Sequence, residues 1–187
     1  TVKIVEATND VLIPALRTGE LDLVVGRLSE HRERHDVVQE VLMDDIACVV
    51  ARRDHPLAAR STLLLHDLAG WEWILPPPET SLRRQVDMAF RQEKLEPPVN
   101  AVESVSLLTN RALLAHTDYL GVLPEQAARG EAASNLLTVL PVTLHATARA
   151  IGITSRRNAV LSPAANGLVE MLRLTAAEMM ARPEAAR

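Results

Sequence analysis

Cysteine, aromatic residues and lysine are scarce in this chain, and each scarcity excludes a class of function. The 187 residues include one cysteine, so no internal disulfide can form, which fits a reducing compartment. The net charge of −4 and an aromatic content of 2% make contact with DNA a poor prospect, because such contact needs a basic face and stacking aromatics. No apolar run reaches the ~18 residues of a membrane span and no secretory signal is visible, so we expect a cytoplasmic protein.

Motifs for enzymatic chemistry are also absent from the sequence. It contains no GxSxG elbow, no Walker loop and no GxGxxG, and its one thiol, Cys48, has no obvious catalytic partner. Two of the six histidines, His31 and His35, have helical spacing but lack the glutamate of an HExxH zinc motif. We therefore expect no enzyme activity, no cofactor and no metal site. An α/β enzyme with an unrecognised site remains an alternative.

Residues 18–28, TGELDLVVGRL, give the clearest structural signal. Gly19 falls where the residue after a helix must adopt a left-handed conformation. The following apolar run, residues 21–25, is typical of a strand covered on both faces in a parallel sheet. Gly26 and Arg27 then stand at the carboxyl end of that strand, where open α/β sheets bind ligands. A fixed guanidinium at this place suits a carboxylate or another planar anion.

Strands and helices are predicted to alternate along the chain, which indicates an α/β fold with parallel sheets. The predicted strands are residues 2–6, 21–25, 37–43, 46–51, 71–75, 99–102, 119–123, 136–140 and 146–154. Predicted helices begin at residues 8–10, 80–81, 104, 124 (ending at Gly130) and 162–163, and residues 63–68 are predicted to form a short helix or turn. The first of these helices should form a right-handed βαβ unit with the strands at residues 2–6 and 21–25. Apolar residues at helical spacing predict the inward faces of two helices: Val105, Leu108, Ala112 and Ala115, and Leu168, Val169, Leu172, Ala176 and Met179. We predict two lobes, the first from residues 1–51 plus 143–187 and the second from residues 52–142. Two crossings between lobes leave a cleft bounded by strand ends and helix N-termini.

Hydroxyl and amide side chains at predicted helix starts are the candidate ligand residues. Thr8 and Asn9 follow a predicted strand in the first lobe, and Thr80 and Ser81 do so in the second. Free backbone N–H groups at such positions attract anions, so the two pairs could grip one anion from both sides. Each pair could equally be a plain helix cap. Further candidates with equally simple structural explanations are Arg27 (surface ion pair), Ser104 (helix cap) and Gly121 (close packing).

Several short segments follow the order and spacing of one known family. They are GELDLVVGRL (residues 19–28), DHPLA (54–58), ILPPPETSLRR (74–84), YLGVLPE (119–125) and SPAANGLVEMLR (162–173). Together they resemble the effector-binding domain of LysR-type transcriptional regulators, and the resemblance covers nearly the whole chain. It implies a two-lobed fold of the type II periplasmic-binding-protein kind, with a mainly parallel sheet in each lobe and two crossover strands.

The resemblance also implies a function. Such domains sense a small-molecule effector and form homodimers or tetramers, while DNA is bound by a separate helix-turn-helix domain. Residues 26–28 (GRL) and 75–78 (LPPP) are similar to regulators of aromatic-acid and sugar-related catabolism, so we expect an anionic, aromatic or sugar-derived effector. The family's first strand and helix have no counterpart before residue 2, so we expect an N-terminally truncated piece of a longer regulator. A solute-binding protein of a transport system is the main alternative.

Overall fold

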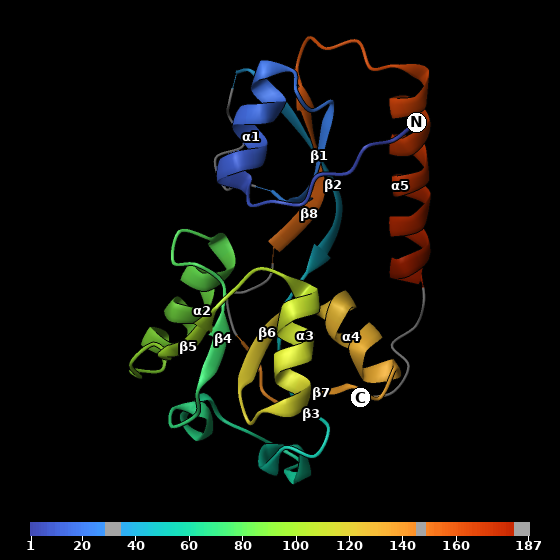
Figure 1. Ribbon diagram of the computed structural model, residues 1–187. Coiled ribbons are helices and arrows are strands. Elements are labelled where there is room, and N and C mark those ends of the chain that lie inside the picture. The colour runs from blue at the N-terminus through green and yellow to red at the C-terminus, as the bar shows by residue number, and fades with distance from the viewer. Residues whose placement is uncertain (29–34, 145–148, 182–187) are drawn as a thin grey trace. The chain divides into compact units, whose positions relative to one another are not determined.

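The computed structural model describes residues 1–28, 35–144 and 149–181, which form two compact units (Figure 1). Unit 1 comprises Thr1–Asp44 and Arg149–Arg187, and unit 2 comprises Asp45–Ala148. The sequence analysis placed residues 46–51 in the first lobe. In the structure, strand β3 (Ala47–Arg52) pairs with two strands of unit 2, β6 and β7. Its backbone hydrogen bonds therefore assign β3 to unit 2.

Unit 1 is built on a three-stranded sheet in the order β1-β8-β2. The strands are β1 (Leu23–Arg27), β8 (Arg149–Arg156) and β2 (Val37–Asp45). Because β8 returns from unit 2, it runs antiparallel to β1, so the expectation of a mainly parallel sheet is wrong here. The expectation that β1 is buried on both faces is also wrong, because Val25 is 46% exposed.

Helix α1 (Asn9–Thr18) is held against this sheet at its carboxyl end. Gly19 adopts the predicted left-handed conformation, with φ of 87°. Arg156 of β8 donates from Nη1 to the carbonyl oxygens of Leu16 (2.5 Å) and Leu21 (2.7 Å). A cation suits this position because the carboxyl end of a helix carries partial negative charge.

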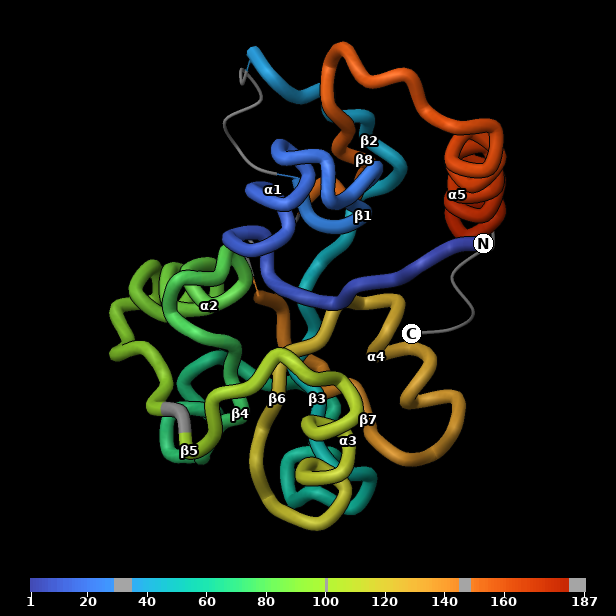
Figure 2. The backbone as a smooth tube through the Cα atoms, turned by 45° about the horizontal axis from the view of Figure 1, so that its top comes forward, coloured from blue at the N-terminus to red at the C-terminus, as the bar shows by residue number. Residues whose placement is uncertain are grey.

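Helix α5 (Pro163–Ala181) covers the side of the sheet away from α1, as Figures 1 and 2 show. The predicted inward stripe is confirmed, because its members are the buried or half-buried side chains Leu168, Val169, Leu172, Ala176 and Met179. Arg173 also forms a bidentate ion pair with Glu40 of β2, with N–O distances of 2.6 and 2.8 Å. This pair holds the pKa of the Glu40 carboxyl below its usual range. Unit 1 is thus a helix–sheet–helix sandwich.

The predicted strand at residues 2–6 is absent from the structure. The segment carries no strand pairing, and Ile4 is 87% exposed. Apolar composition alone does not make a strand, because a strand needs a neighbour to satisfy its backbone hydrogen bonds. The parallel βαβ unit predicted from this segment, α1 and β1 is therefore not formed.

Unit 2 contains a five-stranded sheet in the order β5-β4-β6-β3-β7. Besides β3, its strands are β4 (Trp73–Leu75), β5 (Asn100–Glu103), β6 (Leu120–Pro124) and β7 (Leu137–Val139). β4 runs parallel to β5 and β6, whereas β3 runs antiparallel to β6 and β7. The α/β class is confirmed, with a mixed sheet rather than a mainly parallel one.

Both faces of this sheet are covered by helices. Alternate residues of a strand point to opposite faces, so Trp73 and Leu75 of β4 lie on one side and Ile74 on the other. The first side packs against α2 (Ser81–Gln92). The second side packs against α3 (Leu107–His116) and α4 (Glu125–Ala133). This unit also contains two short 3₁₀ helices, the unpredicted η1 (Pro56–Ala59) and η2 (Leu65–Leu68), which lies in the short helix or turn predicted at residues 63–68.

Helix α3 differs most from the sequence analysis. Its cap is Ser106, whose Oγ accepts the Thr109 amide at 3.3 Å, whereas Ser104 was predicted to be the cap. The buried face also differs from the predicted one, because Leu114 is buried while Leu108, predicted to point inward, is 67% exposed. Helix α4 also runs past Gly130, its predicted end, because a helix interior tolerates one glycine at modest cost.

Candidate functional site

The carboxyl ends of β4, β5 and β6 define one edge of the sheet in unit 2. These strands run parallel, so their carboxyl ends meet at the same side. α2, α3 and α4 each follow one of these strands in the chain and therefore begin at this edge. Helix N-termini carry backbone donors and partial positive charge, so an anion is favoured at such an edge.

Thr80 and Ser81 stand at this edge, as predicted. Thr80 is the cap of α2, because its Oγ1 accepts the Arg83 amide at 3.3 Å and donates to the Pro77 carbonyl at 2.7 Å. The first intrahelical bond runs from Arg84 N to Thr80 O, so the amide of Ser81 precedes it. The Thr80 hydroxyl therefore has a structural role, and backbone amides are the groups that α2 offers to a ligand.

Arginines accumulate in the first turn of α2, a signal that the sequence analysis missed. Arg83 pairs with Asp87 through its Nε at 2.8 Å, and Arg84 donates to the Glu79 carbonyl at 2.5 Å. No acidic residue lies in that turn. Cations at the positive end of a helix are electrostatically unfavourable, and a nearby anion offsets this cost.

Ser104 and Gly121 have different surroundings. Ser104 lies beside the end of β4, because its amide donates to Leu75 O at 3.0 Å, and its hydroxyl accepts the Ser106 amide at 3.2 Å. Gly121 pairs with Ile74 inside the sheet. A Cβ at Gly121 would lie 2.9 Å from Leu114 Cδ1, so this glycine allows α3 to approach. Ser104 is at the candidate edge, and Gly121 has a packing role.

At the third helix of this edge, α4, the carboxylate of Asp45 already contacts the helix start. Asp45 is 2% exposed, and its Oδ1 accepts the Glu125 amide at 3.1 Å, at the first residue of α4. The sequence analysis missed this contact because the two residues are 80 positions apart and no local motif joins them. Since Asp45 occupies the start of α4, the starts of α2 and α3 remain for a ligand.

In unit 1 the structure brings Asn9 and Arg27 together. Asn9 Nδ2 donates to the Arg27 carbonyl at 3.0 Å, which places the start of α1 beside the carboxyl end of β1. Thr8 is the cap residue of α1, but its side chain makes no capping hydrogen bond, and the first intrahelical bonds reach its carbonyl from Val11 and Leu12. The amides of Asn9 and Asp10 precede these bonds.

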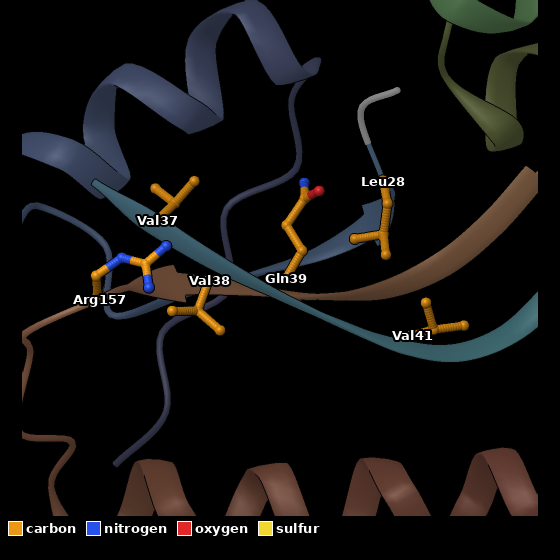
Figure 3. Close-up of a pocket in the computed structure, with 6 residues that line it drawn as sticks. All are labelled: Leu28, Val37, Val38, Gln39, Val41 and Arg157. Atoms are coloured by element: carbon orange, nitrogen blue, oxygen red, sulfur yellow. The ribbon is translucent and has the colours of Figure 1, made fainter. Parts of the chain in front are cut away.

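An open hollow of about 230 Å³ also lies along β2 of unit 1. Its lining residues are Leu28, Val37, Val38, Gln39, Val41 and Arg157. Figure 3 shows Val37 and Gln39 on one side of the strand and Val38 on the other. The only cationic group in the lining, Arg157, donates through Nε to the His35 carbonyl at 2.9 Å. None of the predicted ligand residues lines this hollow.

Two of the expected absences can be examined in the described ranges. In residues 1–28, 35–144 and 149–181, no group of three or more metal-ligating side chains comes together. No helix in this part of the chain is long and apolar enough to cross a membrane. His31, part of the histidine pair considered above, lies outside the described residues.

The Cys48 thiol is expected to be unreactive. Burial, together with Glu125 and Asp45, raises its pKa from 9.0 to about 11. Two pKa units leave about a hundredfold less thiolate at pH 8, and thiolate is the reactive form. Ellman's reagent should therefore modify Cys48 about a hundredfold more slowly in the native protein than in urea, where the same thiol is exposed. Equal rates in the two states would contradict this expectation.

Comparison with known proteins identifies relatives of the chain. Residues 1–177 match the family model described as the LysR substrate binding domain. The HTH-type transcriptional regulator GalR of Pseudomonas putida is 36% identical over 90% of this chain and 42% of its own length. The chain thus spans less than half the length of this curated relative.

Solved structures share the fold. The effector binding domain of QuiR in complex with shikimate aligns with a TM-score of 0.74 at 20% identity, over 92% of this chain and 79% of its own. The CcmR regulatory domain of Synechocystis PCC6803 in complex with 2-PG aligns with a TM-score of 0.75 at 22% identity, over 92% and 81%. At these identities the likeness establishes the fold.

Proposed function

The chain belongs to the LysR substrate-binding domain family, and on this premise we propose that it binds a small organic anion as the effector of a LysR-type transcriptional regulator. The resemblance found in the sequence is thereby confirmed, as is the type II periplasmic-binding-protein-like fold. The family is regulatory and not enzymatic, so the alternative of an unrecognised enzyme is set aside. The solute-binding alternative gains no support from the matches.

The first turn of α2 carries the proposal of an anionic ligand. Arg83 and Arg84 lie at the positive end of this helix with no acidic residue in the turn. A carboxylate bound to the Ser81 amide would offset the positive charge at that end of the helix. The ligands named for the two structural neighbours, shikimate and 2-PG, are consistent with this chemistry.

We also propose an anion-binding position at the start of α1 in unit 1. The start of this helix beside Arg27 offers backbone amides and a guanidinium. An effector that prefers one conformation of the domain needs a differential affinity of only a few kcal/mol to shift the population toward that conformation.

The partners of the domain form a further part of the proposal. Helix α5 presents the apolar side chains of Met171, Leu174 and Met180 to solvent, each more than half exposed. We propose that they are buried in a homodimer or tetramer, since exposed apolar surface favours association. DNA would be reached through a helix-turn-helix domain outside this chain, in the cytoplasm.

Calorimetric titration with shikimate, benzoate and gluconate tests the ligand class, with their methyl esters as uncharged controls. We expect at least one acid to bind while its ester does not. Arg84→Gln and Arg27→Gln should each weaken binding about tenfold or more, as the loss of a charged hydrogen bond does. Arg91→Gln, in the last turn of the same helix α2, is the matched control and should bind as the wild type does. Esters that bind as tightly as the acids would overturn the proposal.

A further inference from the structure

His55 is the most completely buried histidine among the described residues, and it joins separate segments of unit 2. This residue is 2% exposed. Nδ1 accepts the Leu57 amide at 3.1 Å and so caps the short helix η1. Nε2 lies 3.2 Å from the Asp118 carbonyl, in the link between α3 and β6. The ring packs tilted against Trp71, ahead of β4, with 4.4 Å between ring centroids.

These contacts fix one protonation state. A nitrogen that accepts an amide hydrogen carries no proton, so Nδ1 is unprotonated and Nε2 donates to Asp118. A second proton on the ring would turn Nδ1 into a donor facing the Leu57 N–H. The cap of η1 would then be lost, and a charge would be placed in a buried site.

The charged groups around the ring do not offset this cost. Arg52 of β3 and Asp118 act on His55 in opposite directions and pair with each other at 2.7 Å. Asp54 and Glu72, which flank the packed segments, are exposed. Burial is the largest influence and lowers the pKa of His55 below 6.5.

The position of His55 separates it from the candidate ligand edge. Leu120, the first residue of β6, donates its amide to Glu72, so these contacts lie at the amino-terminal edge of β4 and β6. The loop after β3 and the turn between α3 and β6 lie side by side at this end of unit 2 in Figures 1 and 2. The helices that would hold a ligand begin at the opposite edge.

We propose that His55 is an acid-sensitive latch that ties the loop after β3 to the segments before β4 and β6 only while its ring is neutral. Well above pH 6.5 the ring is neutral in both the folded and the unfolded state, and the latch stabilises unit 2 in full. As the pH falls below 6.5, the His55 ring binds a proton in the unfolded chain but not in the folded unit. The unfolding constant then rises by up to tenfold per pH unit, until the pH passes the lowered pKa of the folded state.

Urea unfolding followed by tryptophan fluorescence reports on this unit, because Trp71 and Trp73 both belong to it. His55→Asn keeps an oxygen that can cap Leu57 but cannot titrate. Between pH 7.5 and 5 the unfolding free energy of the wild type should fall with the uptake of about one proton at His55. We expect this contribution to be missing in His55→Asn. His116→Asn, at an exposed site at the end of α3, should retain it. An unchanged pH dependence in His55→Asn would overturn the proposal.

Nuclear magnetic resonance of the wild-type ring decides the question even if His55→Asn fails to fold. We expect a neutral ring protonated on Nε2 at pH 7, with a titration midpoint below 6.5. A midpoint at or above 6.5, or a proton on Nδ1, would contradict the latch.

Discussion

Gly152→Ala is expected to unfold the sheet of unit 1. Gly152 lies in β8, the central strand, opposite Gly26 of β1. A Cβ at this position would lie 1.9 Å from the Glu40 carbonyl oxygen of β2 and 2.8 Å from Leu28 Cδ1. A backbone oxygen cannot rotate away as a side chain can, so β2 and β8 must separate. We expect a loss of at least about 3 kcal/mol, the upper end of ordinary overpacking costs.

Hydrogen–deuterium exchange with mass spectrometry measures this effect directly. Peptides from β1, β2 and β8 should lose protection in Gly152→Ala. The matched control is Gly167→Ala in α5, where nothing lies within 4 Å of the added Cβ. Alanine in a helix interior should raise stability by about 0.5–1 kcal/mol, so the same chemical change has opposite signs at the two sites. Wild-type protection in Gly152→Ala would show that this close approach of the strands is not required.

Phe90→Ala is expected to remove most of the stability of unit 2. Phe90 of α2 and Trp73 of β4 are both fully buried, and their rings meet edge to face at 5.9 Å and 84°. Truncation of a buried phenylalanine typically costs about 3–5 kcal/mol, and the lost ring pair accounts for about 0.5–1.5 kcal/mol of this. Since α2 begins at Ser81, the same change should also loosen the proposed ligand-binding end of this helix.

Tryptophan fluorescence during urea unfolding measures this loss of unfolding free energy. Phe90→Leu keeps much of the volume and should cost less than half as much as the alanine variant. If Phe90→Ala were to cost no more than Phe90→Leu, the buried volume of this side chain would not be what anchors α2.

Local signals in the sequence were sufficient for much of the fold. Gly19 predicted the end of α1, Thr80 predicted the cap of α2, and the apolar spacing of residues 168–179 predicted the buried face of α5. In the first two cases the deciding contacts lie within a few residues of the signal, and in the third the helical repeat of apolar residues marks the buried face whichever element covers it. Family motifs in order then supplied the two-lobed fold, which spacing alone does not determine.

Most of the errors have one physical cause, which is dependence on partners that are distant in the sequence. Residues 2–6 have a strand-like composition but no pairing partner, and the direction of β8 depends on the path of the chain through unit 2. At the candidate site, Asp45 caps α4 across 80 residues, and nothing near Asp45 indicates it. The cap at Ser106 could have been predicted from the sequence. A serine can cap a helix by accepting the amide three residues later, and Ser106 is as good a candidate for this role as Ser104.

A crystal structure of this chain grown with a bound carboxylate, such as shikimate or benzoate, tests the central claim most directly. The account predicts carboxylate density within hydrogen-bonding distance of the Ser81 amide, at the start of α2. A carboxylate bound only elsewhere in the chain would contradict it.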